Sequence, residues 1–349
     1  MRSSSRTTAC TSSERRLRPG WSRWIGRAIL PLLLLLPQCG DPGPRLPPAG
    51  EHLPDRLETA YELAWTDRPQ EAFEAFRKLY LATPALHEAW FGALAAARSR
   101  KEIAAIREDL KRLWPPAHGD EIIIFKTLRI LLGENPENRE KDLYRLAEEE
   151  KKNSLRGWAL LGLGLLYFER GSLEAAVDVL EQALKETDDI PLAHRLRARG
   201  LMRLHRYKDA IDDLESYLQA RPFDPIALYN LGWILLNVRN RPRDARPYLE
   251  RALLVRPDDP DILIALGAAA MLAPEPDLDL AEECFKKALR ISPDDPDIHL
   301  NLGILYADYK DDPESAIMAF RRYMELGGIR KERAERWIEE MRRRKRKKQ

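Results

Sequence analysis

The sequence predicts an all-helical protein made of helix-turn-helix units that repeat along the chain. Charged residues make up 33% of the 349 residues and hydrophobic residues 44%, with only 18 glycines, a composition typical of amphipathic helices rather than sheets. Three segments nearly superimpose, Arg221–Gly232, Arg256–Gly267 and Ser292–Gly303, and their final glycines are 35 and 36 residues apart. Apolar residues follow each segment with the i, i+3, i+4 spacing of a helix that buries one face.

The first element is an apolar stretch at residues 28–37, which follows an arginine-rich segment. It has about ten residues, far fewer than the roughly 20 that span a bilayer, and predicts a secretory signal over residues 1–38. The sequence Leu36-Pro-Gln-Cys39-Gly40 resembles the lipobox of bacterial lipoproteins. That resemblance implies a lipid anchor on Cys39 and, because Gly40 follows it, an outer-membrane lipoprotein on the periplasmic side.

Other interpretations of this amino terminus remain open. Lipoboxes usually have Gly, Ala or Ser where Gln38 stands, and the basic region before the apolar stretch is long enough to place the true start codon further along the chain. An ordinary cleaved signal and a short membrane-associating segment are the alternatives. Residues 39–54 are rich in Pro and Gly and predict an extended linker.

Residues 55–153 carry a fainter form of the repeat. Ala72, Phe76 and Pro84 indicate a first unit, Gly92 and Pro116 a second, and helical stretches at 121–132 and 138–151 a third, degenerate unit. Gly164 lies 68 residues before Gly232, which leaves room for two further units between 154 and 232. Five units are therefore expected over residues 154–328.

Turn residues predict where the first helix of three of these units begins. Pro222, Pro257 and Pro293 are expected to end the preceding helix. An aspartate two residues later takes the N-cap position, at Asp224, Asp259 and Asp295, and a proline follows at the first helical position.

The second helix of each unit shows a further pattern. A small residue stands where two helices must cross, and a bulky residue follows it: the pairs are Ala176 and Leu180, Ala210 and Leu214, Ala245 and Tyr248, Ala281 and Phe285, and Ala316 and Phe320. With the glycines, this pattern resembles the tetratricopeptide repeat, a helix-turn-helix of about 34 residues. The resemblance implies a right-handed α-solenoid of about eight helical pairs over residues 53–328, capped by a helix from about Arg330.

The resemblance also implies a concave groove lined by the first helix of each unit, in which a protein or peptide partner binds. Carried onto this chain, the groove residues are Trp158, Leu161, Phe168, Arg195, Arg199, Arg203, Tyr229, Asn230, Trp233, Asn237, Asn301 and Asp308. Arg195, Arg199 and Arg203 are four residues apart, so they share one helical face, and an acidic ligand would relieve their repulsion. The aromatic and amide side chains beside them could hold a peptide backbone.

A structural interpretation of the same residues competes with this one. The arginines could pair with Asp212, Asp213 or Glu215 on the next helix, because charged stripes on helices are commonly solvated or locally paired. Trp233 could pack internally, and Asn230 and Asn301 are shared repeat positions that could serve only structure.

The charge distribution bears on the alternative function, a polyanion- or RNA-binding protein. Residues 1–38 and the basic block Arg342–Lys348 together carry a net charge of +13, whereas the whole chain carries +2, so the middle carries −11. The acidic middle of the chain and the export signal argue against nucleic acid as the ligand, because nucleic-acid binding needs a basic contact face. The basic block is expected to fray, because its like charges repel. It could bind anionic lipid or another polyanion, or it could be an ordinary solvated chain end.

The sequence holds no pattern that indicates catalysis, a metal or a cofactor. No H-E-x-x-H occurs among its six histidines, and Gly162 and Gly164 fall inside a helical pattern rather than in a phosphate-binding loop. The three cysteines lie far apart, and Cys284, in a helical apolar pattern, is expected to be a buried thiol. A non-catalytic scaffold is therefore expected.

Overall fold

The computed structural model describes residues 57, 59–60, 63, 68–83, 86–113, 121–133, 138–150, 153–187 and 190–348. The chain divides into two units, residues 1–38 and 39–349, and all the described residues belong to the second. The expected secretory signal, the linker up to residue 54 and Cys39 lie outside the described residues.

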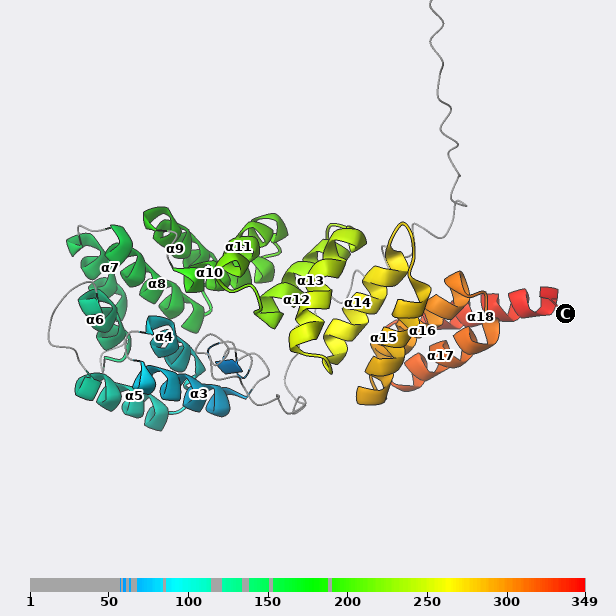
Figure 1. Cartoon of the computed structure of the whole chain (residues 1–349), viewed down its shortest axis with the longest axis horizontal. Helices are drawn as coiled ribbons and strands as arrows, with labels where there is room; N and C mark the ends of the chain where they lie inside the picture. The colour runs from blue at the N-terminus through cyan, green and yellow to red at the C-terminus, as the bar shows by residue number, and fades with distance from the viewer. Residues whose placement is uncertain are drawn as a thin grey trace, which may run out of the picture. The chain divides into compact units, whose positions relative to one another are not determined.

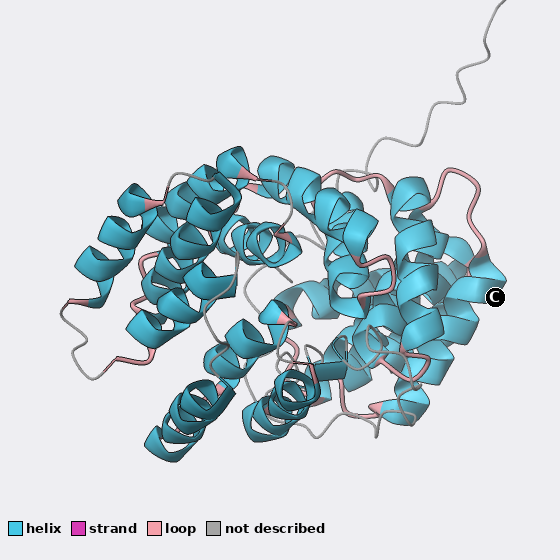
Figure 2. Ribbon diagram, turned by 60° about the vertical axis from the view of Figure 1, so that its left-hand side comes forward, coloured by secondary structure: helices cyan, strands magenta, loops and turns pink. Residues whose placement is uncertain are grey.

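Within the described ranges the chain is helical and has no strand (Figures 1 and 2). The helices are α3 (Pro69–Ala82), α4 (His87–Ala96), α5 (Arg100–Leu113), α6 (Glu121–Leu131), α7 (Arg139–Glu149), α8 (Asn153–Glu169), α9 (Leu173–Glu186), α10 (Pro191–Arg203), α11 (Tyr207–Ala220), α12 (Pro225–Asn237), α13 (Pro242–Val255), α14 (Pro260–Leu272), α15 (Leu278–Ile291), α16 (Pro296–Ile304), a π-helical turn η2 (Leu305–Tyr309), α17 (Pro313–Glu325) and α18 (Lys331–Lys348). The all-helical prediction is confirmed.

The five expected units are hairpins of consecutive helices, from α8 with α9 to α16 with α17, and each packs against the next. Aspartate caps begin three of the first helices, as predicted. The Asp224 carboxylate accepts hydrogen bonds from the backbone N–H groups of Ile226 and Ala227 at 3.0 and 2.9 Å, and Asp259 and Asp295 cap α14 and α16 in the same way. Each cap satisfies N–H groups that a helix leaves unpaired at its start.

A glycine lets the two helices of a hairpin approach closely. A Cβ atom at Gly303 would lie 2.4 Å from the Phe320 ring, and one at Gly267 would lie 2.6 Å from the Phe285 ring. At Gly232 the neighbour is Leu249, which is fully buried, so the expectation that Tyr248 fills this position is wrong. The spacing of four residues from alanine to bulky residue, kept in the other units, selects Leu249.

The amino-terminal helices depart from the repeat. Gly92 in α4 was expected to begin a unit with the helix that follows it, but a Cβ there would lie 2.4 Å from Phe76 in α3. Helix α4 packs closely on α3 and only slightly on α5. A close-packing glycine marks a helix crossing but does not say which neighbour crosses it, so the sequence assigned the wrong partner.

The basic carboxy terminus is helical rather than frayed. Ala334, Ile338 and Met341 of α18 are buried, and Trp337 stacks on Phe320 at 5.0 Å, which confirms the expected capping helix. The predicted fraying is wrong because part of the positive charge is neutralised. Arg344 donates to the Ala307 carbonyl and to Glu340, and Lys345 pairs with Glu314.

Candidate functional site

We use "first-helix face" for the surface formed by the first helices of the five units, α8, α10, α12, α14 and α16 with η2. All twelve of the predicted groove residues belong to these helices. Their surroundings differ from one unit to the next, so they are described in chain order.

The arginines of α10 differ in what they contact. Arg195 lies 3.6 Å from the buried Asp224 carboxylate, the cap of α12. Arg199 and Arg203 are exposed, and among the described residues neither has a hydrogen-bonding or ion-pairing partner. Desolvation, followed by the charges of Arg195, Arg203 and Arg98, lowers the pKa of the Arg199 guanidinium.

The Asp213 carboxylate, which could have neutralised Arg195, Arg199 and Arg203, binds two other side chains of α10. Asp213, on α11, accepts two hydrogen bonds from Arg197, at 2.6 and 2.9 Å, and its Oδ1 lies 2.8 Å from Nδ1 of His194. Both partners come from the other side of α10. The alternative in which Asp213 pairs with the predicted arginines therefore does not occur.

Helix α12 supplies the aromatic and amide side chains. Tyr229 and Trp233 are partly buried, and the Trp233 ring lies 6.3 Å from that of Tyr207. Asn237 donates to the Trp233 carbonyl at 3.1 Å, as a helix residue does to its own backbone. The Asn230 side chain is 9% exposed and has no hydrogen-bond partner among the described residues, which leaves its amide available to a peptide backbone.

Acidic side chains follow on α14 and α16. Desolvation, and then the charges of Asp259 and Asp295, raise the pKa of Asp261 to about 6, and Arg256 opposes this. Desolvation and Asp295 likewise raise the pKa of Asp297 to about 6. The first-helix face therefore changes sign along the stack, and the sequence analysis did not single out these carboxylates.

Tyr229 and Asn301 lie within this acidic part. Desolvation, followed by the charges of Asp261, Asp259 and Asp297, holds the pKa of Tyr229 well above its usual value. Asn301 is 6% exposed and donates to the Asp297 carbonyl at 2.8 Å, so its amide nitrogen serves the helix, in line with the structural interpretation.

Trp158, at the other end of the predicted set, contacts the amino-terminal helices. Its ring stacks on Phe91 of α4, with centroids 5.6 Å apart and an interplanar angle of 15°, and meets the edge of His87 at 5.6 Å. Glu88 of α4 also binds Arg221, just after α11, at 2.9 Å. Helix α4 thus packs against the first-helix face beside α8 (Figure 1).

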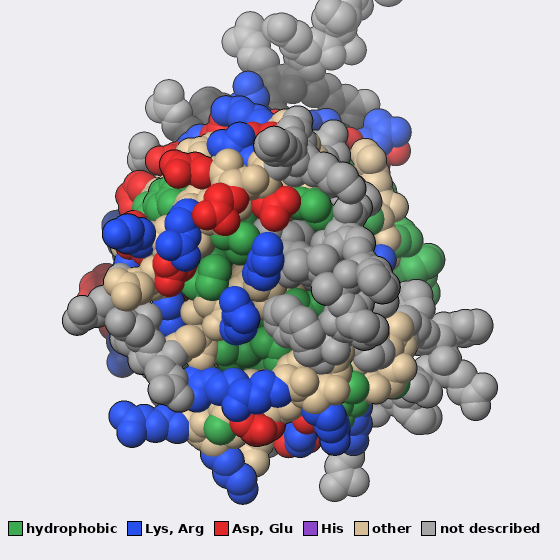
Figure 3. Space-filling view, turned by 90° about the vertical axis from the view of Figure 1, so that its left-hand side faces the viewer, with side chains coloured by type: hydrophobic (Ala, Val, Ile, Leu, Met, Phe, Trp, Pro, Cys, Tyr) green, Lys and Arg blue, Asp and Glu red, His purple; other side chains and the backbone are tan. Residues whose placement is uncertain are grey.

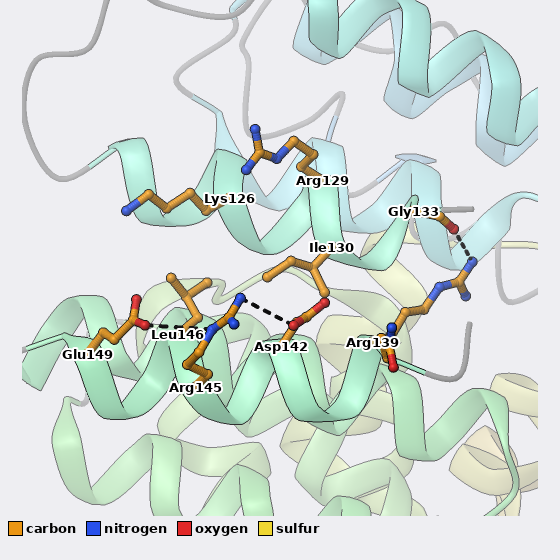
Figure 4. A pocket seen from close by; sticks show the side chains of 10 residues that line it. Lys126, Arg129, Ile130, Gly133, Arg139, Asp142, Arg145, Leu146 and Glu149 are labelled. Carbon is orange, nitrogen blue, oxygen red and sulfur yellow. Dashed lines mark hydrogen bonds and ion pairs between the residues drawn. The ribbon is translucent and has the colours of Figure 1, made fainter. Parts of the chain in front are cut away.

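A separate cavity of about 420 Å³ lies between α6 and α7. Arg145 crosses it and pairs with Asp142 at 3.3 Å and Glu149 at 3.6 Å, while Arg139 donates to the Gly133 carbonyl at 2.9 Å (Figure 4). From this side of the molecule, Lys and Arg side chains surround patches of hydrophobic ones (Figure 3). The ion pairs account for most of the charge that lines the cavity.

The described residues hold no group of three or more His, Cys, Asp or Glu side chains placed to bind a metal ion. Cys284 is 3% exposed, which confirms the expected buried thiol, and burial raises the pKa of this thiol to about 11. Of the helices that the structure describes, none combines the length and the apolar character needed to cross a membrane.

Comparison with protein-family models finds tetratricopeptide repeats in the same part of the chain. Models described as "Tetratricopeptide repeat" match residues 145–191, 195–237 and 227–263, and one described as "TPR repeat" matches residues 277–308. The matches leave residues 192–194 and 264–276 uncovered, so most of α14 lies outside them. No curated protein matches the chain.

Solved structures of repeat proteins are similar to parts of the chain. YrrB, described as a TPR protein with an unusual peptide-binding site, is 25% identical over 54% of this chain and 93% of its own, with a TM-score of 0.47. MamA from Desulfovibrio magneticus RS-1 is 27% identical over 51% of this chain and 96% of its own, with a TM-score of 0.44. PilW, described as a type IV pilus biogenesis factor, is 22% identical over 49% of this chain and 77% of its own, with a TM-score of 0.41.

Proposed function

This chain carries tetratricopeptide repeats, and from that premise we propose that it is a non-catalytic scaffold that binds an extended, acidic segment of a partner protein on its first-helix face. Repeats of this kind present long surfaces to protein and peptide partners, which supports the scaffold role. The acidic character of the partner is inferred from the charges of α10.

One observation carries the choice of ligand. Arg199 and Arg203 are exposed side by side on α10 and have no carboxylate partner among the described residues. Each guanidinium presents N–H donors in the geometry that a carboxylate accepts, and their mutual repulsion favours a bound anion. Asn230 and Trp233 on the next first helix would contact the peptide backbone and an apolar side chain.

The test measures the affinity of a fluorescein-labelled peptide that alternates Glu with Gly and Ser, by fluorescence anisotropy at low salt. Reversing both arginines, Arg199→Glu with Arg203→Glu, should weaken binding by tenfold or more, since hydrogen bonds to charged groups contribute on the order of 1.5–3 kcal/mol each. Arg195 stays unchanged because it also pairs with the cap of α12.

The matched control reverses two exposed arginines on second helices, Arg243→Glu with Arg290→Glu, which changes the net charge equally. If both double variants weaken binding to the same extent, only overall charge matters and the site assignment fails. If an RNA oligonucleotide binds the unchanged protein more tightly than the peptide does, the polyanion-binding alternative replaces this proposal.

We also propose that Cys39 carries a lipid that anchors the scaffold to the periplasmic side of the outer membrane. The apolar stretch before Cys39 and the Pro/Gly-rich residues after it support this role, since a linker lets an anchored domain stand off its membrane. Cells fed a labelled fatty acid should label the full-length protein, and Cys39→Ser should abolish both the label and membrane fractionation. Label that persists in Cys39→Ser would refute the anchor.

A further inference from the structure

The strongest feature that the proposed function leaves unused is the basic end of α18. Every residue from Arg342 to Lys348 is basic, and the structure keeps this block helical. The part of α18 before it is held against the protein, because Ala334, Ile338 and Met341 are buried on one face of the helix. The block therefore presents its charges from a docked helix rather than from a frayed chain end.

Two of the basic residues interact with the protein itself. Arg344 donates to the Ala307 carbonyl at 2.9 Å and to Glu340 at 3.0 Å. Lys345 pairs with Glu314 in the first turn of α17. These interactions hold the end of α18 on η2 and α17, so the charges of these two residues serve the structure.

Three other basic residues are directed away from the protein. Arg342, Arg343 and Arg346 are exposed, and none has a hydrogen-bonding or ion-pairing partner among the described residues. With 3.6 residues per turn they lie within about 100° of the helix circumference, away from the buried face. We call them the α18 basic face. Glu339, one turn earlier on the same side, is exposed and makes no ion pair with them, so the basic surface begins after it.

The size of this face favours a flat anionic surface over a nucleic acid as its ligand. Helix α18 is the last described helix and packs on α17 (Figure 1). Its seven basic residues extend over about 10 Å, so they reach few phosphates of a nucleic acid strand. Proteins that bind single strands also stack bases on aromatic side chains, but the one aromatic residue of α18, Trp337, is partly buried on Phe320.

A bilayer that contains anionic phospholipids meets these limits. Its phosphate groups form a plane, which the last two turns of a helix can touch, and each basic side chain close to that plane adds its own attraction. We infer that the α18 basic face binds the phosphate headgroups of anionic phospholipids, so that this end of the repeat stack lies on a membrane surface.

The inference extends the proposed membrane location and does not depend on peptide binding at the first-helix face. Three arginines give a weak attachment that salt screens. The proposed lipid on Cys39 would supply a second attachment at the other end of the chain, and two attachments together bind a membrane more firmly than one.

The test measures cosedimentation of the full-length protein with vesicles of equal parts phosphatidylglycerol and phosphatidylcholine. All proteins carry Cys39→Ser, so that a lipid on that residue cannot contribute. The triple variant Arg342→Gln, Arg343→Gln, Arg346→Gln should lower the partition coefficient by about tenfold or more at low salt, since each basic side chain near an anionic surface contributes roughly fivefold. Gln forms helices about as well as Arg, so the melting temperature should stay unchanged.

The matched control removes three equal charges from exposed arginines outside α18. It carries the substitutions Arg239→Gln, Arg243→Gln and Arg290→Gln. This control should partition as the unchanged protein does, and vesicles of phosphatidylcholine alone should not distinguish the two triple variants.

The outcomes are decisive for the inference and separate from the proposed function. Equal losses in both triple variants would show that only net charge matters, and the α18 basic face would not be a lipid site. The same conclusion follows if neither variant loses binding, or if the α18 variant loses binding to an RNA oligonucleotide but not to the vesicles. Each of these failures leaves the peptide proposal standing, because peptide affinity is measured without lipid.

Discussion

Single residues set both the helix starts and the electrostatics of the first-helix face. Asp224, which is 1% exposed, does both. Its carboxylate accepts hydrogen bonds from two backbone N–H groups and from the Tyr217 hydroxyl, the last at 2.8 Å. The same carboxylate lies 3.6 Å from Arg195. The cap could be predicted from the Asp-Pro pair alone. The contact between Asp224 and Arg195 could not be predicted, because it depends on how two units stack.

Replacing Asp224 with Ala should therefore destabilise the protein more than a simple cap loss does. We expect about 2 kcal/mol, from the lost cap and from the lost hydrogen bond between the Tyr217 hydroxyl and the carboxylate. Asp295→Ala removes a cap without such a tyrosine and should cost about 1 kcal/mol. Urea unfolding followed by circular dichroism measures both, and equal losses would show that the Tyr217 contact contributes nothing.

Asp261 and Asp297 predict a pH dependence of stability. Their pKa values in the folded protein are about 6, above the ordinary aspartate value of 3.8, so the folded state holds more protons than the unfolded state between those limits. Stability from this source is present below about pH 4 and is lost as pH rises to 6. The double variant Asp261→Asn with Asp297→Asn should raise the melting temperature at pH 7.5 and flatten its change between pH 4 and 6.

The matched control for this variant is Asp212→Asn, an exposed carboxylate on α11. It should leave the pH profile of the melting temperature unchanged. A double variant whose profile is as steep as that of the unchanged protein would contradict the assignment of this dependence to the two carboxylates.

At the scale of elements, the sequence was most informative where one signal had one meaning. Caps, glycines and alanines located the helices of residues 154–328, because a cap marks where a helix begins and the small residues mark where two helices cross. The pattern was less informative for α4. The sequence of α4 is apolar on almost all sides, so its burial could have been predicted. Which helices bury it could not, and the structure shows that these are α3, α6 and α8.

The docking of α4 gives a prediction of its own. The buried core falls into two clusters, one from Leu57 to Leu196 and one from Val177 to Met341, so a defect in the first should remain local. Phe91→Ala removes a side chain that is 1% exposed and should cost about 3–5 kcal/mol. Hydrogen exchange should accelerate in residues 69–113.

The second cluster provides the internal control for this experiment. Exchange in residues 225–325 should stay as it is in the unchanged protein. If Phe91→Ala accelerated exchange equally throughout, the two clusters would unfold as one unit and the contact between α4 and α8 would not be a separate element of stability.

At the scale of the molecule, stacking explains both the stability and the available surface. Each hairpin buries its apolar sides against its neighbours, and α18 covers the last of them. The order of units and the identity of the first helices followed from the sequence. The change of charge along the first-helix face, from Arg199 to Asp297, did not, because it arises from residues of different units that only stacking brings onto one face.

The most direct test of the account is photocrosslinking of the Glu-rich peptide from two positions that differ only in their face. A photoreactive phenylalanine at position 233 lies on the first-helix face, and one at position 254 replaces Leu254, which is 80% exposed on the second helix α13. The account predicts a crosslink from position 233 that excess unlabelled peptide suppresses, and none from position 254. A crosslink from position 254 alone, or equal crosslinks from both, would contradict the claim that the first-helix face is the binding surface.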